Sequence, residues 1–296
     1  MSAALLECVP NISEGRDAAI VERIAAAVRG TSAVTLLDVS SDADHNRSVL
    51  TYLGPPEAVL AATLALCRAA FAAIDMRGHS GAHPRLGAVD VVPLVPLQGL
   101  AMEAVVDHAH ELGRRIGELG VPVFFYERAA RLPERRDLAA VRAGQYEGLA
   151  ARFAAGERAD EGPSEFVPRA GACAVGARPP LIAFNVNLGS GELAVARRIA
   201  DAVRARTGGF AAVKAMAVPL AGRGQVQVSM NLIDHERTPI HRVLETIRSE
   251  AARHGVPVVG CELIGLAPLA AFEETLRHYL QLEEFSLERI IETHLL

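Results

Sequence analysis

The sequence lacks the features that mark nucleic-acid, membrane and secreted proteins. Its formal net charge is -5, so it has no basic excess from which to build the concentrated positive face that binds nucleic acid. No run approaches the roughly 20 apolar residues that span a bilayer. The first residues, MSAALLECVPNISEGRD, contain neither the basic start nor the apolar stretch of a secretory signal. We therefore expect a cytoplasmic protein that binds neither nucleic acid nor a membrane.

Cysteine is also scarce. The four cysteines lie far apart and form no C-x-x-C pair, which argues against a zinc knuckle and a dense disulfide framework. We expect all four to be small apolar residues of the interior: Cys8, Cys67, Cys173 and Cys261. Half of the 296 residues are hydrophobic and 22% are charged, which is typical of a globular chain with one large domain or two moderate ones.

The first half of the chain has a legible order of expected strands and helices. Apolar residues recur at helical spacing in AAIVERIAAAV, between Asp17 as a helix cap and Gly30 as its end. The expected strands are 4–9, 33–39, 47–53 and 89–95, and the expected helices are 18–28 and 57–73. The order is βαββαβ.

The second half repeats this order. The expected strands are 181–188, 212–218, 225–233 and 256–266, and the expected helices are 192–206 and 239–254. Between the halves we expect helices at 101–118 and 137–155, a strand at 121–126, and a linker or cleft-crossing loop at 156–172. Two βαββαβ units predict an α+β protein with two ferredoxin-like α/β lobes.

We place the boundary between the lobes near residue 178. This gives an N-terminal domain of residues 1–178 and a C-terminal domain of residues 179–296. Because a cleft between two lobes is a favoured location for a small-molecule site, we expect a ligand cleft or tunnel there.

The segment DMRGHSGAHPRLGAVD (75–90) holds the densest group of reactive side chains. A loop histidine is most often solvated or structural, but His83 has His79 and Arg85 close by in the sequence. Histidine titrates near neutral pH and can take and return a proton in one turnover, so His83 is our candidate catalytic residue. Metal binding by His79 and His83 is an alternative, but the residues between them form a poor helix and the glutamate of H-E-x-x-H is missing. We therefore expect no metal.

A second polar segment, DVSSDADHNR (38–47), lies between two expected strands. By itself it is typical of an acidic, solvated hairpin loop that is rich in turn-forming residues. If it faces the loop of His83, its carboxylates can orient the imidazole or balance a cationic substrate. The charged side chains of interest are Asp38, Asp42, Asp44 and Arg47.

The second half adds polar residues that alternate with apolar ones. Asn185 and Asn187 alternate along one expected strand and Gln227 along another, which puts polar side chains on the face opposite the core. A plain half-exposed sheet explains this pattern, and a polar sheet face is equally suitable as the wall of a cleft. Arg178 and Lys214 are possible sources of positive charge for such a cleft.

Six motifs occur in an order that resembles one known family. They are ECVPNISEGR (7–16), LLDVSSDADHNRSV (36–49), HSGAHPRLGAVDVVPLVP (79–96), VGARPPLIAFNVNL (175–188), QVSMNLIDHERTPIH (227–241) and GCELIGLAPLAA (260–271). Together they span essentially the whole chain, which resembles glutamate formimidoyltransferase with its N- and C-terminal formiminotransferase subdomains. The resemblance implies two α/β lobes, a homodimer, and a positively lined tunnel between the lobes that binds tetrahydrofolate.

The reaction that the resemblance implies moves the formimino group of N-formimino-L-glutamate to N5 of tetrahydrofolate and releases L-glutamate, a late step of histidine degradation. By resemblance, His83 matches the catalytic histidine of the H-P-R motif and acts as general acid and base. Tetrahydrofolate is then a co-substrate, and no metal is implied. The residues to which we assign substrate or folate binding are Asp38, Asp42, Asp44, Arg47, Arg85, Arg178, Asn185, Asn187, Lys214 and Gln227.

Two positions depart from the family pattern. Ser40 stands where the family usually has aspartate, and Ala82 where it usually has glutamate just before the histidine. Less negative charge near His83 lowers its pKa and weakens the attraction for a cationic donor. One alternative is therefore transfer of a neutral formyl group from 5-formyltetrahydrofolate to glutamate. Another is a folate-binding protein without turnover, which would have no need for His83.

Overall fold

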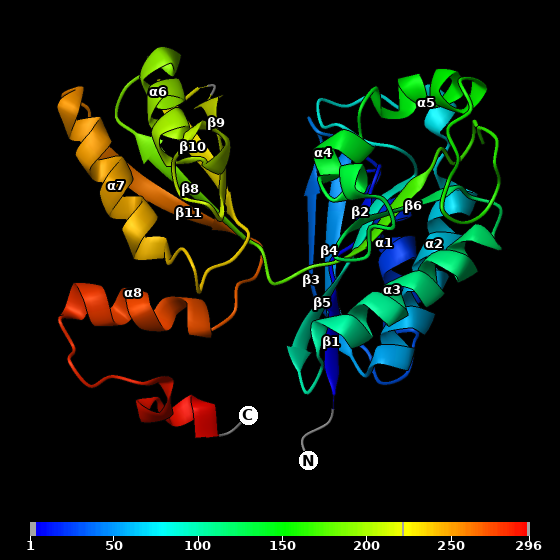
Figure 1. Cartoon of the computed structure of the whole chain (residues 1–296), viewed down its shortest axis with the longest axis horizontal. Coiled ribbons are helices and arrows are strands. Elements are labelled where there is room, and N and C mark those ends of the chain that lie inside the picture. The colour runs from blue at the N-terminus through cyan, green and yellow to red at the C-terminus, as the bar shows by residue number, and fades with distance from the viewer. Residues whose placement is uncertain (1–3, 221, 295–296) are drawn as a thin grey trace. The chain divides into compact units, whose positions relative to one another are not determined.

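The computed structural model describes residues 4–220 and 222–294, and it confirms the α+β class that the sequence predicts. The chain divides into two compact units, unit 1 (Met1–Arg178) and unit 2 (Pro179–Leu296). Each unit has a β-sheet of its own, and Figure 1 labels the helices and strands.

Unit 1 is built on a seven-stranded sheet. Its strands are β1 (Leu5–Cys8), β2 (Asn11–Ile12), β3 (Thr35–Asp42), β4 (Arg47–Gly54), β5 (Val89–Gln98), β6 (Val123–Glu127) and β7 (Cys173–Ala177). Its α-helices are α1 (Ala18–Arg29), α2 (Pro56–Ala73), α3 (Met102–Gly117), α4 (Leu138–Val141) and α5 (Gln145–Ala154). β1 and β2 each pair with both β4 and β5, β3 is added beside β4, and β7 and β6 extend the sheet beyond β5 in parallel.

Helices cover both faces of this sheet (Figure 1). On one face α1, α2 and α3 pack against the strands, with Ile24, Leu66 and Leu112 in one apolar cluster. On the other face α4 and α5 pack over β5, β6 and β7, where Leu149 and Phe124 share a second cluster. We call this second face, opposite α1 to α3, the site face.

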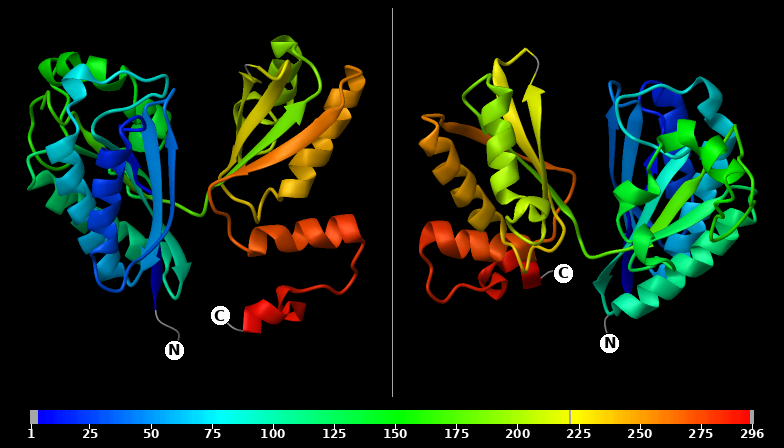
Figure 2. Two further views of the ribbon diagram at one scale, coloured as in Figure 1. Left: turned by 180° about the vertical axis from the view of Figure 1, so that it is seen from behind. Right: turned by 45° about the horizontal axis from the view of Figure 1, so that its top comes forward.

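Unit 2 has a four-stranded antiparallel sheet with the strand order β11-β8-β10-β9. The strands are β8 (Ile182–Leu188), β9 (Val213–Leu220), β10 (Gln225–Leu232) and β11 (Val258–Ile264). Figure 2 shows α6 (Leu193–Val203) and α7 (Ile240–Arg253) side by side on one face of this sheet, with α8 (Ala270–Leu280) against α7.

Several local predictions are confirmed and others are wrong. Asp17 caps α1 as predicted, because its side chain accepts hydrogen bonds from the N–H groups of Ala19 and Ile20 at 2.9 and 3.2 Å. The expected helix 137–155 is in fact two helices, since Gly144 and Gln145 have φ angles of 76° and 55° and interrupt it.

The two segments predicted to be irregular are also more ordered than expected. The acidic segment 38–47 is not all loop, because β3 runs on to Asp42 and pairs it with Arg47. The segment 156–172 lies within unit 1 along β6, where the Asp160 carboxylate accepts the N–H of Phe125 at 2.8 Å. The sequence also gave no sign of β7, a short strand of CAVGA.

The cysteines are confirmed as interior residues in three cases out of four. Cys8, Cys67 and Cys173 are buried, and burial raises the pKa of Cys8 to about 12. The prediction is wrong for Cys261, which is exposed on β11 because this strand forms an edge of its sheet.

One helix among the described residues, α2, is long and apolar enough to cross a membrane by length and composition alone. It lies in the core of unit 1, where Val59, Leu60, Leu66 and Cys67 are fully buried, and a core helix of this kind passes the same test.

Two glycines within helices provide a matched test of packing. A Cβ at Gly113 of α3 would lie 2.4 Å from the ring of buried Phe125, whereas one at Gly148 of α5 meets nothing within 4 Å. We expect Gly113→Ala to destabilise unit 1 by about 1–3 kcal/mol through overpacking. Gly148→Ala should stabilise it by up to about 1 kcal/mol, since alanine favours helix. Urea unfolding followed by tyrosine fluorescence measures both, and equal effects would contradict the packing of α3.

Candidate active site

Hydrogen bonds join two loops of unit 1 at the site face. The turn between β3 and β4 meets the loop that precedes β5: His79 Nε2 donates to the Asn46 carbonyl at 3.1 Å, and Asn46 Nδ2 donates to the Ser80 carbonyl at 3.1 Å. The main-chain N–H of Ala82 also donates to the Asp44 carbonyl at 3.2 Å. Gly81 is required here, because a Cβ at this position would lie 2.2 Å from the carbonyl oxygen of His45.

These loops surround a small pocket. The residues that line it are Ser13, His45, Asn46, Arg47, His79, His83, Arg85 and Asp90. The polar segments 38–47 and 75–90, which are far apart in the sequence, therefore contribute to one site.

His83 is half-buried in this pocket and held in its neutral form. Burial, followed by the positive charges of Arg47 and Arg142, lowers the pKa of His83 from its ordinary value of 6.5 to about 3. Its Nδ1 atom is buried and has no hydrogen-bond partner among the described residues. At neutral pH the ring is therefore an uncharged imidazole that can accept a proton.

The charge balance around His83 depends on Asp90, which is 1% exposed at the start of β5. Its carboxylate accepts the main-chain N–H of Leu86 at 2.9 Å and forms an ion pair with Arg142, which follows α4. Arg47 donates to the side chain of Asn11, and burial lowers its pKa to about 10 in spite of the attraction of Asp90. Two arginines and one carboxylate thus share this part of the site face.

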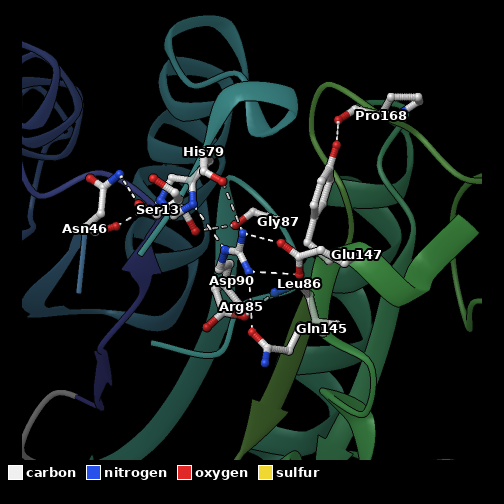
Figure 3. Close-up of polar contacts among 12 residues, drawn as sticks. Ser13, Asn46, His79, Arg85, Leu86, Gly87, Asp90, Gln145, Glu147 and Pro168 are labelled. Carbon is white, nitrogen blue, oxygen red and sulfur yellow. Dashed lines mark hydrogen bonds and ion pairs between the residues drawn. The ribbon is translucent and has the colours of Figure 1, made fainter. Parts of the chain in front are cut away.

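Arg85 and His79 support the loop. Figure 3 shows the Arg85 guanidinium between His79 and the carboxylate of Glu147. It donates to the two Glu147 oxygens at 2.6 and 3.0 Å and from Nε to His79 Nδ1 at 3.1 Å. Because His79 donates from one ring nitrogen and accepts at the other, its tautomer is fixed, and burial lowers its pKa. Arg85, predicted to bind substrate, has its guanidinium occupied by protein partners.

The acidic segment contributes one carboxylate that contacts a pocket residue. Asp42 accepts the main-chain N–H of His45 at 2.8 Å and faces His45 Nδ1 at 3.0 Å. The hydrogen bond from the main-chain N–H is the largest cause of the lowered pKa of Asp42. Asp38 and Ser40 share the face of β3 with Asp42, because Val39 between them packs toward the core of unit 1.

A further arginine lies on the site face beyond this pocket. Arg178 follows β7 and lies near Glu7 of β1 and Tyr126 of β6. Burial raises the pKa of Tyr126 to about 12, while Arg178 and, less strongly, Arg142 oppose the rise. The positive charges of Arg47, Arg142 and Arg178 therefore act on neighbouring titratable groups across one face of the sheet.

The polar residues predicted in unit 2 share one face of its sheet. Gln227 lies opposite Asn187, and its Nε2 donates to Asn187 Oδ1 at 2.8 Å. Both amides also donate to the carboxylate of Glu262 on β11 at 3.0 Å, which contributes to the lowered pKa of Glu262. Asn185 is buried on the same face of β8, two residues before Asn187. Lys214 on β9 lies opposite Asn231 of β10.

Sequence reasoning missed three residues that organise these groups: Arg142, Glu147 and Glu262. No local sequence pattern distinguishes any of the three from other charged residues. Each pairs with a residue that is distant in the sequence; Arg142 and Asp90, for example, are 52 residues apart. Among the residues that the structure describes, no group of three or more His, Cys, Asp or Glu side chains could hold a metal ion.

The lowered pKa of His83 predicts how stability depends on pH. Between 6.5 and about 3 the unfolded chain binds a proton at this position that the folded chain does not, so folding loses stability as the pH falls through that range. His83→Gln removes this proton. We expect urea unfolding at pH 7.5 and 4.5 to show a smaller loss of stability for this variant than for the unsubstituted protein. His254→Gln, at an exposed position after α7, is the control, and an unchanged loss in His83→Gln would contradict the assignment.

The ion pair of Arg85 with Glu147 leads to a second prediction, a difference in unfolding free energy between two variants. The Arg85 side chain is only 8% exposed, so Glu147→Ala leaves a buried guanidinium short of its acceptor and should cost about 1–3 kcal/mol of unfolding free energy. The matched control is Glu118→Ala at the C-terminal end of α3, which should cost less than about 1 kcal/mol because its partner Arg114 is half exposed. Equal losses in urea unfolding would show that Arg85 does not depend on this carboxylate.

Comparison with known proteins gives a consistent result. Residues 5–178 match the N-terminal subdomain of the formiminotransferase domain, and residues 183–295 match the formiminotransferase domain. The chain is 44% identical to a glutamate formimidoyltransferase of Streptococcus pyogenes serotype M1, over 99% of both chains. It is 46% identical to the one of Thermoplasma acidophilum, over 98% of this chain and 96% of that protein.

A relative with two named activities matches over part of its length. This is the formimidoyltransferase-cyclodeaminase of Gallus gallus, which is 43% identical over 95% of this chain and 53% of its own length. The chain thus spans about half of that relative. The resemblance predicted from the six motifs is confirmed, and this chain belongs to the formiminotransferase domain family.

Proposed function

We propose that this protein transfers the formimino group from N-formimino-L-glutamate to N5 of tetrahydrofolate, giving 5-formiminotetrahydrofolate and L-glutamate. The observation that carries the proposal is the identity of 44–46% with relatives named glutamate formimidoyltransferase, over at least 96% of each chain. A pocket that holds an uncharged histidine near positive charge agrees with it.

The reaction needs a group that moves protons. N5 of the folate attacks the amidine carbon of the donor, and the tetrahedral intermediate must lose a proton from N5 and supply one to the glutamate nitrogen that leaves. His83 is neutral at working pH and can take the first proton as general base. Proton transfer by a well-placed histidine contributes about 10²- to 10⁴-fold in rate.

Binding of the substrates requires positive charge, since both glutamate and folate carry carboxylates. Arg47 and Arg178 on the site face are suitable partners because guanidinium groups bind carboxylates in bidentate fashion. Asp38 and Asp42 lie on the same face of β3 and would favour a cationic formimino group, with Asp44 in the adjoining turn. Arg85, with its guanidinium occupied by Glu147 and His79, holds the loop of His83 in place.

We assign folate binding in unit 2 to the polar face of its sheet. Asn187 and Gln227 form an amide pair there, Asn185 is adjacent, and Lys214 supplies positive charge on the neighbouring strand. In this proposal residues 1–178 are the catalytic subdomain and residues 179–296 the folate-binding subdomain. The ligand cleft or tunnel that the resemblance implies would require both subdomains to bind the same folate.

The ferredoxin-like character of the two subdomains is part of the same proposal. In unit 2 the elements β8-α6-β9-β10-α7-β11 follow the order βαββαβ, with the strand order 4-1-3-2 in the antiparallel sheet. In unit 1 the same order is followed if β1 and β2 count as one strand, and β6 and β7 are additions. A cytoplasmic homodimer without nucleic-acid or membrane partners completes the proposal.

A turnover assay on the purified protein tests this function. It supplies N-formimino-L-glutamate with tetrahydrofolate in one reaction and 5-formyltetrahydrofolate with glutamate in another. We expect turnover of the first pair, and a fall in kcat of about 10²- to 10⁴-fold in His83→Ala because the base is lost. His254→Ala, in an exposed position of unit 2, should retain full activity.

The other outcomes identify the alternatives. Turnover of the formyl pair alone would mean that a neutral donor has replaced the cationic one, in keeping with Ser40 and Ala82. Binding of tetrahydrofolate without turnover of either pair would leave a folate-binding protein and refute the transferase.

A further inference from the structure

His45 is a second histidine in the pocket, and neither the sequence analysis nor the comparisons give it a role. It lies in the turn between β3 and β4, and its ring meets the His83 ring edge to face, with centroids 5.8 Å apart. The side chain is 48% exposed, so its ring is accessible to a substrate in the pocket.

The ring of His45 is oriented by a carboxylate. Asp42 faces Nδ1 at 3.0 Å, which fixes the proton on that atom and leaves Nε2 for chemistry. The turn itself needs only the main chain of His45, whose N–H donates to the other Asp42 oxygen at 2.8 Å. The hydrogen bond that holds the turn therefore does not itself require an imidazole at this position.

The reaction needs two proton transfers at two different nitrogens. Burial and the charges of Arg47 and Arg142 disfavour the protonated ring of His83, so a proton that His83 takes from N5 is released quickly and is not held until the glutamate nitrogen leaves. His79 cannot supply the proton, because both of its ring nitrogens are engaged by the protein. Among the histidines that line the pocket, His45 is the one with an exposed ring and a carboxylate partner.

We propose that His45 is a second catalytic residue, the general acid that protonates the leaving nitrogen, and this inference rests on the proposed function. The bond from N5 to the amidine carbon forms, and the N5 proton passes to His83. The bond from that carbon to the glutamate nitrogen then breaks, and this nitrogen takes a proton from Nε2 of His45, whose ring enters the step as imidazolium and leaves it as neutral imidazole with its remaining proton on Nδ1, facing Asp42. Transfer of a proton from His83 to His45 through solvent restores both rings.

The groups that surround His45 come from several segments. Asp42 lies on β3, Asp44 is its neighbour in the turn, Arg47 begins β4, and His83 lies opposite. Arg16 also reaches the turn, where its Nε donates to the Ala43 carbonyl at 2.8 Å. Asp42 is the one carboxylate in ion-pair contact with the ring among the residues described, so Asp42→Asn should reduce the fraction of the protein in which His45 carries the proton to be donated.

The test compares pH profiles of formimino transfer in the unsubstituted protein, His45→Gln and Asp42→Asn. A general acid acts only in the transition state, so we expect kcat of His45→Gln to fall by about 10²-fold with KM nearly unchanged. The alkaline limb of the profile, where the acid loses its proton, should be absent in His45→Gln. Asp42→Asn should show a smaller fall in kcat and an alkaline limb displaced along the pH axis. His254→Gln should have the same kcat and pH profile as the unsubstituted protein.

Chemical rescue separates a catalytic role from a structural one. Because the His45 ring is half exposed, His45→Ala leaves room for added imidazole, and we expect imidazole to restore part of kcat in proportion to its protonated fraction. No rescue in a variant that remains folded by tyrosine fluorescence would assign the loss to packing and overturn the proposal. If His45→Ala does not fold, the profile of His45→Gln decides.

The results also distinguish this inference from the proposed function. A kcat of His45→Gln within twofold of the unsubstituted value, or an alkaline limb that persists, overturns the role of His45 while His83→Ala still loses activity. No turnover of N-formimino-L-glutamate by the unsubstituted protein overturns both.

Discussion

The candidate site depends on the pairing of the buried carboxylate of Asp90. A charge that is 1% exposed must be paired and hydrogen-bonded, and Asp90 has both the N–H of Leu86 and the guanidinium of Arg142. The first bond fixes the loop of His83 to the start of β5, and the second brings the end of α4 onto the site face. Arg142, just after α4, and Glu147, in the first turn of α5, stand on either side of the interruption at Gly144 and pair with Asp90 and Arg85.

The elements that the sequence predicts well are those with a strong local pattern. α1 has a helical period and an Asp17 cap, β10 alternates polar and apolar residues over its whole length, and β8 does so from Phe184 to Leu188. β7 and the break at Gly144 escaped prediction because a five-residue strand and a helix interruption have no periodic signal. Both depend on tertiary contacts, since β7 exists as a strand only between β5 and β6.

The site could be predicted in composition but not in detail. Turn-forming and reactive residues identified segments 38–47 and 75–90, and the structure brings them together through His79, Asn46 and Ser80. The partners of the charged residues were not predictable, because an arginine such as Arg85 looks the same in sequence whether it binds a substrate or a protein carboxylate. The neutral state of His83 was equally hidden, as it results from burial and from Arg142, a residue 59 positions later in the chain.

The charge state of His83 bears directly on the donor that the site can accept. A protonated formimino group is cationic, and an imidazole of His83 that burial, Arg47 and Arg142 keep neutral adds no further positive charge beside this donor. The same arginines would repel the amidine unless carboxylates lie close to it. In the proposed function, Asp38 and Asp42, on the site-face side of β3, would attract the amidine while Arg47 and Arg178 would bind the carboxylates of glutamate and folate. In that proposal the carboxylates of β3 and Arg47 at the start of β4 would take opposite charges of one substrate, a cationic amidine on an anionic molecule.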